Sequence, residues 1–512
     1  MSYDLTPVRA LGLLDDEMVT LRKLLTVWQS KRRKNALIST YYDGHRAFRD
    51  LGISIPPQLK NSRAALGWPS KAVGAAATKH AFEEFTLNGE SDPFEISELL
   101  VRNDWESELP QIFTAAYKHG VSFITVSSGD TALGEPEVMI QARDAEWTTA
   151  LWDKRRREIS AALAITDTDD AGDPSEATMF LRDKTVFMDK KWGVWKAKFL
   201  PNPTGRVMVE AIRHDPELNR PFGHSRITRE VRYLTDVALR TLVRTESGAE
   251  FFASPQRYAL GASEEAFKHK DRWVALNSRV LALELNEEGR KPEVGQFPQM
   301  SMDPHLSMYR QLAQNFASAT DLPTSTVGIF ADNPQSAEAM QAAEARLSDL
   351  ADKQWRISTG PLRRIAQDIV MVRDKLTEPP AESWKIGVKY TPPKYVSPQA
   401  QSDYISKVTA AIPDLASTTV ALRKAGLTAE EILEVQAEWK KSAGPSVLAQ
   451  IEAATAGGTG STSQPAPTPV DDLRARFEAL KAARDAGIDP QSAADLIGGL
   501  DGITFTQLGG AA

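Results

Sequence analysis

Apolar residues recur every three to four positions over residues 15–38, which is the spacing of one face of an amphipathic helix. The apolar positions are Met18, Leu21, Leu25 and Trp28. Acidic residues open this segment, where the helix dipole favours negative charge. The basic run at 31–34 is expected to close the helix as a solvated last turn, and a nucleic-acid or localisation patch is the alternative interpretation.

Between residues 95 and 212 the pattern changes from helical to strand-like. A helix is predicted to lead into a buried strand at 121–126. Turn residues such as those at 169–174 and 202–205 punctuate the region that follows. The further strand-like runs are 137–141, 157–165, 177–181, 185–188, 192–199 and 207–212. This order predicts a region of helices and hairpins rather than an alternating series of βαβ units.

Residues 225–247 form the clearest helical pattern, with two opposed faces. Ser225 is expected to cap this helix and Gly248 to stop it. One face is apolar, through Ile227, Val231, Leu234, Ala238 and Leu242. The opposite face is mainly cationic, through Arg229, Arg232, Asp236, Arg240 and Arg244. An ordinary surface helix would show this pattern, and a helix that packs against neighbours on both sides would show it too.

A small β unit is expected at 255–301, with a strand at 280–285. Further helices are predicted, at 303–320, 334–375 and 398–442. The second begins with Asn333 as its cap and Pro334 in its first turn, where a missing N–H costs nothing.

The stretch 454–469 carries no charge and no side chain able to build a core, so it is predicted to be a flexible linker. A short helical hairpin is expected beyond it.

Composition bounds the function. The length of 512 residues corresponds to about three or four domain-sized units, and 42% hydrophobic with 25% charged residues is ordinary for a globular protein. A formal net charge of −7 disfavours a broad DNA-gripping face, which needs many Lys and Arg contacts. The absence of cysteine excludes disulfides, thiolate metal sites and cysteine nucleophiles.

Targeting and catalytic signals are missing from the sequence. No apolar stretch approaches the length of a membrane span, and the first 14 residues do not resemble a secretory signal, so we expect a soluble chain made in the cytoplasm. There is no phosphate-binding loop, nucleophile elbow or zinc-protease motif. The seven histidines never fall at i, i+4 spacing, so no helical metal pair is expected and no cofactor is predicted.

One acidic turn is the exception, because clustered carboxylates are typical ligands of Ca²⁺ or Mg²⁺. It comprises Asp167, Asp169, Asp170 and Asp173, between two strand-like runs. It lacks the downstream glutamate of an EF-hand loop, so a solvated hairpin tip is the favoured interpretation. A metal-dependent nuclease or hydrolase built on the Asp167–Asp173 cluster is kept as an alternative, although we expect the chain not to be an enzyme.

A series of short motifs occurs at 41–45, 51–53, 56–59, 205–207, 219–228, 250–251, 255–258, 320–323, 327–329, 333–339 and 486–490. Each motif is unspecific alone, but together they cover nearly the whole chain. Read in order, they resemble the portal proteins of tailed bacteriophages, the head-to-tail connector family, and especially those of actinobacterial phages. One departure is the stretch 206–209, where a proline is expected after Val207.

The resemblance implies an α+β portal-type subunit with an α/β wing, a two-helix stem, a small α/β clip, a long tunnel helix and an α-helical crown. The segments mapped from it are the wing at 1–223 and 361–397, the stem helices at 224–254 and 302–322, the clip at 255–301, the tunnel loop and helix at 323–360, and the crown at 398–453. The linker at 454–469 and the C-terminal hairpin and tail at 470–512 have no assigned role.

The same resemblance implies a homo-oligomeric ring, usually a dodecamer, at one capsid vertex of the virion, assembled in the host cytoplasm. Double-stranded DNA would pass through its channel during packaging and ejection. The implied protein partners are the terminase packaging motor, a head–tail adaptor, and the major capsid and scaffolding proteins, with no membrane. An acidic conduit would let DNA slide where a basic wall would hold it.

Three groups of residues follow as candidate sites, with no catalytic or metal-binding residue among them. The tunnel loop would face the channel and DNA through Asp332, Asn333, Gln335 and Ser336. The stem face would contact the next subunit through Arg229, Arg232, Asp236, Arg240 and Arg244. The clip would meet the motor and adaptor through Lys268, Lys270, Arg272, Arg290 and Lys291. A monomeric scaffold or adaptor protein remains a further alternative.

Overall fold

The computed structural model describes most of the chain. The described residues are 10–45, 64–253, 257–260, 293–296, 301–329, 337–393, 398–413, 415, 418–427, 431–432 and 434–439. The chain divides into two units, residues 1–394 and 395–512.

Helices of the first unit are α1 (Asp15–Tyr42), α2 (Trp68–Ala77), α3 (Ser97–Arg102), α4 (Trp105–His119), α5 (Arg229–Ala253), α7 (Asp303–Ala319) and α8 (Ala337–Arg373). The described helices of the second unit include α9 (Pro398–Ala411) and α10 (Thr419–Lys424).

Strands are confined to the first unit within the described residues. They are β1 (Ala10–Leu11), β2 (Ala81–Leu87), β3 (Glu90–Ser91), β4 (Val121–Ser128), β5 (Val138–Asp144), β6 (Thr148–Asp153), β7 (Glu158–Thr168), β8 (Pro174–Phe180), β9 (Lys184–Lys191), β10 (Val194–Pro201), β11 (Val209–Arg213), β12 (Arg257–Leu260), β13 (Glu293–Gln296) and β14 (Ile386–Thr391). They form sheets in the orders β1-β10-β9-β8-β7-β6, β11-β4-β5, β14-β2-β3 and β12-β13.

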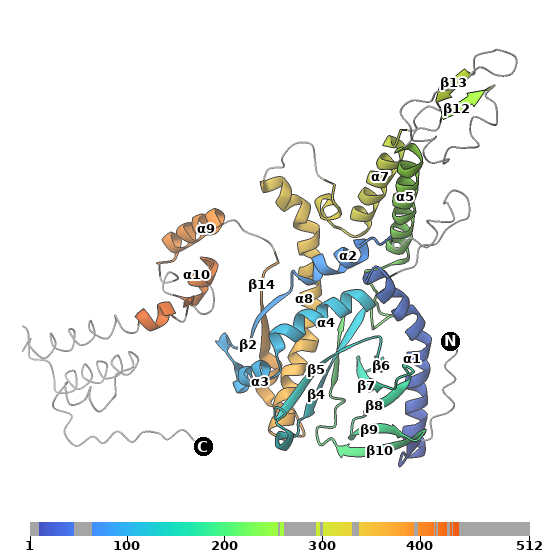
Figure 1. The fold of residues 1–512 in the computed structure, drawn as a ribbon. Coiled ribbons are helices and arrows are strands. Elements are labelled where there is room, and N and C mark those ends of the chain that lie inside the picture. Colours follow the sequence, from blue (N-terminus) through green and yellow to red (C-terminus); the bar gives the residue numbers. More distant parts are fainter. Residues whose placement is uncertain are drawn as a thin grey trace, which may run out of the picture. The chain divides into compact units, whose positions relative to one another are not determined.

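The β11-β4-β5 sheet is covered on both faces. Ile124 and Val126 of β4 belong to the core that this sheet forms with α4 and α8. Phe123, on the opposite face of β4, packs toward strands β6, β7 and β8 of the six-stranded sheet. The other face of that larger sheet is covered by α1, through Leu21 and Leu24 (Figure 1). Strands buried on both faces explain the near-continuous apolar run at 121–126.

The helix predicted at 15–38 is confirmed, but its predicted end is wrong. The basic run does not stop α1, because Asn35, Ile38 and Tyr41 continue the buried face to Tyr42. The guanidinium of Arg32 instead lies over the Trp28 ring, 4.9 Å from its centroid. At the acidic start, the buried Glu17 carboxylate accepts a hydrogen bond from the Leu14 backbone N–H at 2.9 Å.

The predicted strands of the 121–212 region are all present as β4, β5 and β7 to β11, joined largely as hairpins. Five strands were not predicted, namely β1, β2, β3, β6 and β14. β14 pairs with β2, about 300 residues earlier in the chain, and no local pattern reveals such a partner. Where proline was expected after Val207, the strand β11 begins at Val209 and pairs with β4.

Both predicted ends of the 225–247 helix are wrong. Helix α5 begins at Arg229, and the Thr228 hydroxyl, rather than that of Ser225, accepts the Val231 N–H of the first turn. The helix continues through Gly248 to Ala253. A Cβ at Gly248 would lie 3.2 Å from the Met302 methyl carbon, so glycine here gives room to the segment that enters α7.

Of the elements predicted after residue 254, some lie within the described residues and others lie outside them. Helices α7 and α8 confirm the helical patterns at 303–320 and 334–375, and α9 and α10 confirm the pattern at 398–442 over 398–411 and 419–424. Strands β12 and β13 pair within the predicted β unit, while its strand at 280–285 lies outside the described residues, as do Asn333, Pro334, the linker and the tail hairpin. The mixed helix and strand content with open sheets fits the expected α+β class.

Candidate functional site

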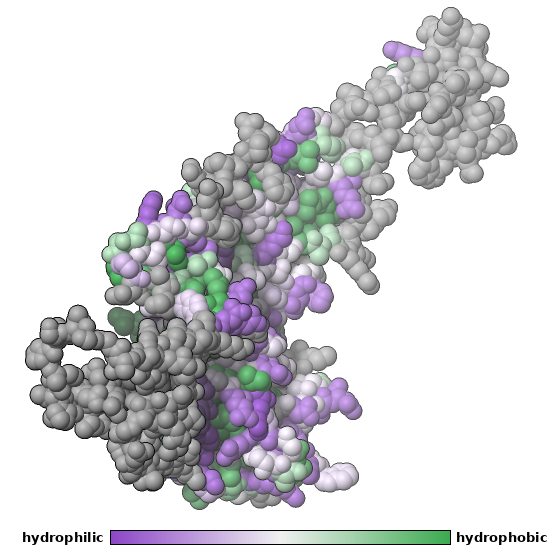
Figure 2. Space-filling view, turned by 90° about the vertical axis from the view of Figure 1, so that its left-hand side faces the viewer, coloured by the Kyte–Doolittle hydropathy of each residue, from purple (hydrophilic) through white to green (hydrophobic). Residues whose placement is uncertain are grey.

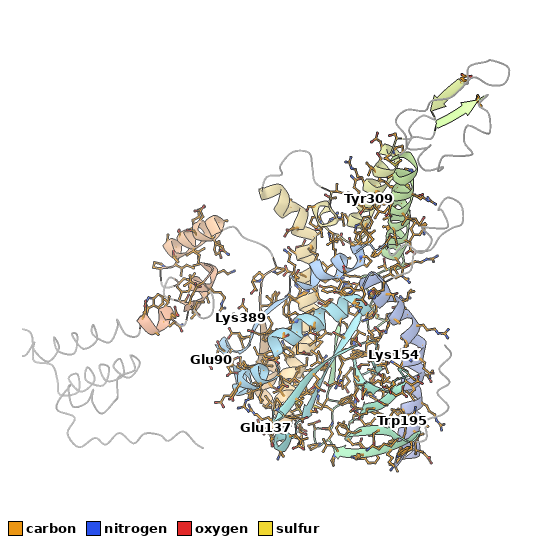
Figure 3. The ribbon with its side chains drawn as sticks, viewed as in Figure 1. Glu90, Glu137, Lys154, Trp195, Tyr309 and Lys389 are labelled. Carbon is orange, nitrogen blue, oxygen red and sulfur yellow. The ribbon has the colours of Figure 1, made fainter. Side chains whose placement is uncertain are left out.

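Helices α5 and α7 lie side by side and form the two-helix element that the sequence predicted (Figure 1). Their shared core also takes in α2 and the end of α1. Tyr309, labelled on α7 in Figure 3, places its ring 5.5 Å from that of Trp68, and Phe316 lies 4.9 Å from the same indole. Trp68 therefore anchors α7 to the body of the subunit.

The predicted apolar face of α5 is confirmed as a packing face. Ile227, Val231, Leu234 and Ala238 are buried, and Leu242 is half-buried. Four of the five belong to the core shared with α7 and α2. The helical spacing therefore located the inner face of α5 before any tertiary contact was known.

The charged face of α5 is partly engaged within the subunit. The Tyr41 hydroxyl lies 2.9 and 3.0 Å from the two carboxylate oxygens of Asp236 and donates to that group. The Arg232 guanidinium lies 6.0 Å from the centroid of the Tyr41 ring. Arg229 is exposed, and Arg240 is half-buried. Asp236 and Arg232 thus fix α1 against α5.

Arg244 closes this face toward the far end of α5. It is half-buried, and its Nε is buried without a hydrogen-bond partner among the described residues. A buried guanidinium nitrogen without an acceptor is costly.

Arg226, which precedes α5, was not singled out from the sequence, yet it joins three helices. It is buried, its Nε donates to the Ala72 carbonyl of α2 at 2.8 Å, and its terminal nitrogen donates to the Thr320 carbonyl after α7. The guanidinium also lies 5.9 Å from the Tyr117 ring of α4. Burial lowers the pKa of Arg226 from its ordinary value. Its place in the 219–228 motif was the one available signal.

The segment before α5 is held tightly against the end of α4. The His224 N–H donates to the His214 carbonyl at 2.9 Å, and the His214 N–H donates to the Gly120 carbonyl at 2.9 Å. Gly223 and Gly120 both have positive φ, and a Cβ on Gly223 would lie 2.0 Å from the His214 oxygen. This close backbone packing sets where α5 leaves the body of the subunit.

Two predicted sites lie outside the described residues. They are the tunnel loop with Asp332, Asn333, Gln335 and Ser336, and the clip residues Lys268, Lys270, Arg272, Arg290 and Lys291.

The acidic turn at 167–173 lies at the β7–β8 hairpin, as the favoured interpretation expected. Asp169 accepts the backbone N–H groups of Ala171 and Asp173 at 3.1 and 2.9 Å, which is how a hairpin tip satisfies its own backbone. Within the described chain, the group of side chains that could hold a metal lies elsewhere, at His119, Asp144 and Glu146. None of these three was selected from the sequence.

No helix in the described part of the chain combines the length and the apolar character that a bilayer crossing requires.

Comparisons with known proteins place these features in context. The family model described as phage portal protein, SPP1 Gp6-like, matches residues 21–444. The portal protein of Mycobacterium phage L5 is 28% identical over 349 residues, which cover 67% of this chain and 72% of the relative. The portal protein of Mycobacterium phage D29 is 28% identical over 353 residues, with 67% and 73% covered.

Among solved structures, similarity extends to a chain in the neck of a native GTA particle computed with C12 symmetry. The TM-score is 0.38 at 12% identity, with 72% of this chain and 89% of the other covered. A chain in the neck of an empty GTA particle computed with C6 symmetry gives 0.39 at 12% identity, with 74% and 96% covered. TM-scores of 0.38 and 0.39 are too low to support a conclusion about assembly.

Proposed function

The chain belongs to the SPP1 Gp6-like family of phage portal proteins, and from this premise we propose that it assembles into a dodecameric ring whose channel passes double-stranded DNA. Members of this family are structural components of the virion. The ring would stand at one capsid vertex, contact the major capsid and scaffolding proteins, and dock the terminase motor during packaging and the head–tail adaptor afterwards. Assembly would take place in the host cytoplasm. The family match over residues 21–444 carries this proposal.

The order of elements along the chain supports a stem and clip. Helix α5 leads into β12 after a few residues, β13 pairs back with β12, and α7 follows shortly afterwards. A helix, a small β unit and a second helix are what a stem–clip–stem arrangement requires. We assign the stem to 224–254 and 302–322 and the clip to 255–301. The wing, tunnel and crown keep the boundaries expected from the sequence, although α8 runs unbroken across the 360/361 boundary.

Exposed apolar side chains on the stem support its role in subunit contact. Tyr233 on α5 is 63% exposed, and Leu306 and Met308 on α7 are 48% and 43% exposed. In Figure 2, hydrophobic patches interrupt the hydrophilic surface of the described chain at several places. In a closed ring, each subunit presents one face to the preceding copy and a different face to the next. We assign Arg229, Arg240 and Arg244 to that contact. Arg232 and Asp236 lie on the same face and are also assigned to it, although both contact Tyr41 within the subunit.

Solution mass and electron microscopy of the purified chain test the ring. The expected result is a species near twelve times the 56.3 kDa chain mass, seen as rings with a central hole. Charge reversal at the exposed Arg229 and at Arg240 should reduce the ring fraction, since it inverts the charge of the face that is assigned to the contact. Arg155→Glu, an exposed arginine in the β6–β7 turn, is the matched control. If rings form equally well in all variants, the charged face of α5 is not part of the contact between subunits.

A separate experiment addresses the tunnel loop at 331–336. Particles assembled with a deletion of this loop should fail to retain packaged DNA, because the loop is assigned to the constriction of the channel. Normal packaging and retention would show that the assignment is wrong.

The clip is tested by binding of the packaging motor. Charge reversal at Lys268, Lys270 and Arg272 should weaken binding of the terminase, because these cations are assigned to the docking surface together with Arg290 and Lys291. Unchanged motor binding would exclude that surface.

A further inference from the structure

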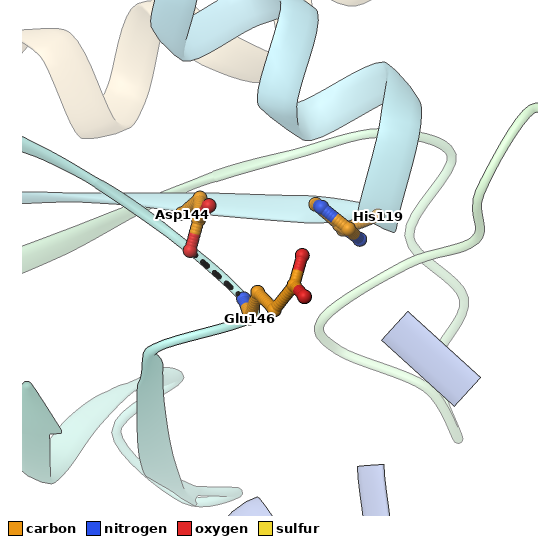
Figure 4. Close-up of side chains that lie close together, drawn as sticks. All are labelled: His119, Asp144 and Glu146. Carbon is orange, nitrogen blue, oxygen red and sulfur yellow. Dashed lines mark hydrogen bonds between the residues drawn. The ribbon is translucent and has the colours of Figure 1, made fainter. Parts of the chain in front are cut away.

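The end of α4 and the β5–β6 connection bring three potential ligands together (Figure 4). His119 is the last residue of α4, Asp144 is the last residue of β5, and Glu146 follows in the connection to β6. One ligand atom from each side chain lies within 4.8 Å of the other two. About 25 residues separate the histidine from the carboxylates, so the fold rather than local spacing creates the cluster.

The histidine has unsatisfied polar atoms. His119 is 9% exposed, and neither of its ring nitrogens has a hydrogen-bond partner among the residues that the structure describes. A buried ring nitrogen without a partner is rare in a native structure and points to a ligand.

The two carboxylates are held in place by the surrounding chain. One oxygen of Asp144 accepts the backbone N–H groups of Glu146 and Trp147 at 3.0 and 3.1 Å. One oxygen of Glu146 accepts the Ser39 hydroxyl of α1 at 2.7 Å. The second oxygen of each carboxylate has no hydrogen bond within the described residues. These bonds orient the acids in the way that outer-shell partners orient metal ligands.

Helix α1 also fixes the backbone of the connection. Asn35 Nδ2 donates to the Ala145 carbonyl at 2.7 Å, and Trp28 Nε1 donates to the Glu146 carbonyl at 2.8 Å. The carboxylate-bearing loop is therefore tied to α1 at three positions, Trp28, Asn35 and Ser39.

A cavity of about 860 Å³ gives solvent access to the cluster. His119 and Asp144 form part of its wall, together with Glu108, Lys118 and the hairpin residue Asp167. A hydrated cation therefore has a route to the cluster from solvent.

We propose that His119, Asp144 and Glu146 bind a divalent transition-metal cation, with Zn²⁺ as the best match. An imidazole with two carboxylates suits Zn²⁺, whereas Ca²⁺ and Mg²⁺ sites are built from oxygen ligands. Three protein ligands leave a fourth position to water. Ligand atoms bound at about 2.0–2.2 Å from one ion lie closer together than 4.8 Å, so small side-chain rotations complete the site.

The bound ion would brace the subunit. It joins the end of α4 to the β5–β6 connection and, through Ser39, to α1. A ligand that binds only the folded state raises the free energy of unfolding by mass action. The site is independent of the portal assignment, and its role is structural.

The test uses the full chain, stripped with a chelator and titrated with ZnCl₂ by calorimetry and thermal unfolding. One Zn²⁺ per chain and a rise in Tm are expected. His119→Gln and Glu146→Gln should each weaken binding by at least about tenfold and reduce the Tm shift at a given ZnCl₂ concentration. Asp167→Asn is the matched control, because it removes a carboxylate from the same cavity wall but not from the cluster, and it should bind as the wild type does.

Several outcomes would overturn the proposal. One is a wild-type chain whose Tm does not respond to Zn²⁺. Another is wild-type affinity in Glu146→Gln, which would show that the ion does not bind at this cluster. This variant serves even where His119→Gln fails to fold, since Glu146 is only half-buried. An equal Tm rise with Mg²⁺ or Ca²⁺, lost in the same variants, would exclude the transition-metal class.

Discussion

Arg364 and Glu210 form a bidentate ion pair between α8 and the edge strand β11. Nε of Arg364 lies 2.7 Å from one carboxylate oxygen of Glu210, and Nη2 lies 2.7 Å from the other. The two residues are 154 positions apart in the sequence, and Glu210 is almost fully buried. This fork geometry fixes the orientation of α8 on the sheet as well as its distance.

Removal of one partner should be costly, because it leaves the other charge poorly compensated. Glu210→Gln is expected to lower the free energy of unfolding by about 2–4 kcal/mol. Urea denaturation monitored by circular dichroism measures the change. The exposed pair Arg102–Glu98 is the control, and Glu98→Gln should cost less than about 0.5 kcal/mol. Equal losses in the two variants would contradict a special role for the Arg364 pair.

Asp368, one turn after Arg364, should make stability depend on pH. Its carboxyl is fully buried, and this burial raises its pKa to about 8 despite Arg206 at 3.2 Å. Between its ordinary pKa of 3.8 and about 8, the folded chain holds a proton that the unfolded chain releases. The free energy of unfolding therefore falls as pH rises through this window.

Asp368→Asn removes that titration. The stability of the variant relative to the wild type should rise steadily between about pH 5 and pH 8 in urea denaturation. Parallel profiles for the two proteins would show that Asp368 is ionised in the folded state.

Buried histidines should make the chain sensitive to acid. Burial lowers the pKa of His80 to about 3 and that of His214 to about 4. Below the ordinary value of 6.5, the unfolded chain binds protons that the folded chain excludes, so stability is lost as pH falls from 6.5 toward 4. His80→Gln should flatten this loss in acid denaturation followed by tryptophan fluorescence. An unchanged acid profile would contradict the role of His80.

Gly223 should tolerate no side chain. Gly223→Ala places a Cβ 2.0 Å from the His214 carbonyl oxygen, and the backbone on both sides is held. We expect a loss of about 3 kcal/mol or more. Gly172→Ala is the matched control, since Gly172 has a similar positive φ of 79° with nothing within 4 Å, so its cost should be about 1 kcal/mol. Thermal unfolding compares the two variants. Equal losses of stability would mean that the positive φ, and not the contact with the His214 oxygen, causes the cost at Gly223.

The sequence predicted the elements whose pattern is local. The apolar stripe of α5 follows from helical periodicity, and the strands β4, β5 and β7 to β11 follow from short strand-like runs bounded by turn residues. Helix ends were predicted less well. Ser225 was expected to cap α5, but its hydroxyl donates to the Lys118 carbonyl of α4 and accepts the Ile227 N–H, while the Thr228 hydroxyl accepts the Val231 N–H of the first turn. The contact with α4, which no local pattern shows, holds Ser225 in the segment before the helix.

The candidate sites divide in the same way. The charged stripe of α5 was visible from spacing, but spacing could not show that Tyr41 engages Asp236, because that contact spans 195 residues. Spacing also could not show that His119, at the end of α4, lies beside Asp144 and Glu146, at the end of β5 and in the connection after it.

By itself, the sequence determined the family, the mixed helix and strand content, and the helix–β unit–helix order at the middle of the chain. These depend on residue type and near-neighbour spacing, which a linear chain carries directly. Tertiary structure decided which charges are engaged within the subunit, where α5 starts, and which polar groups are buried together. Burial and low local dielectric set these properties, and both arise when distant segments pack.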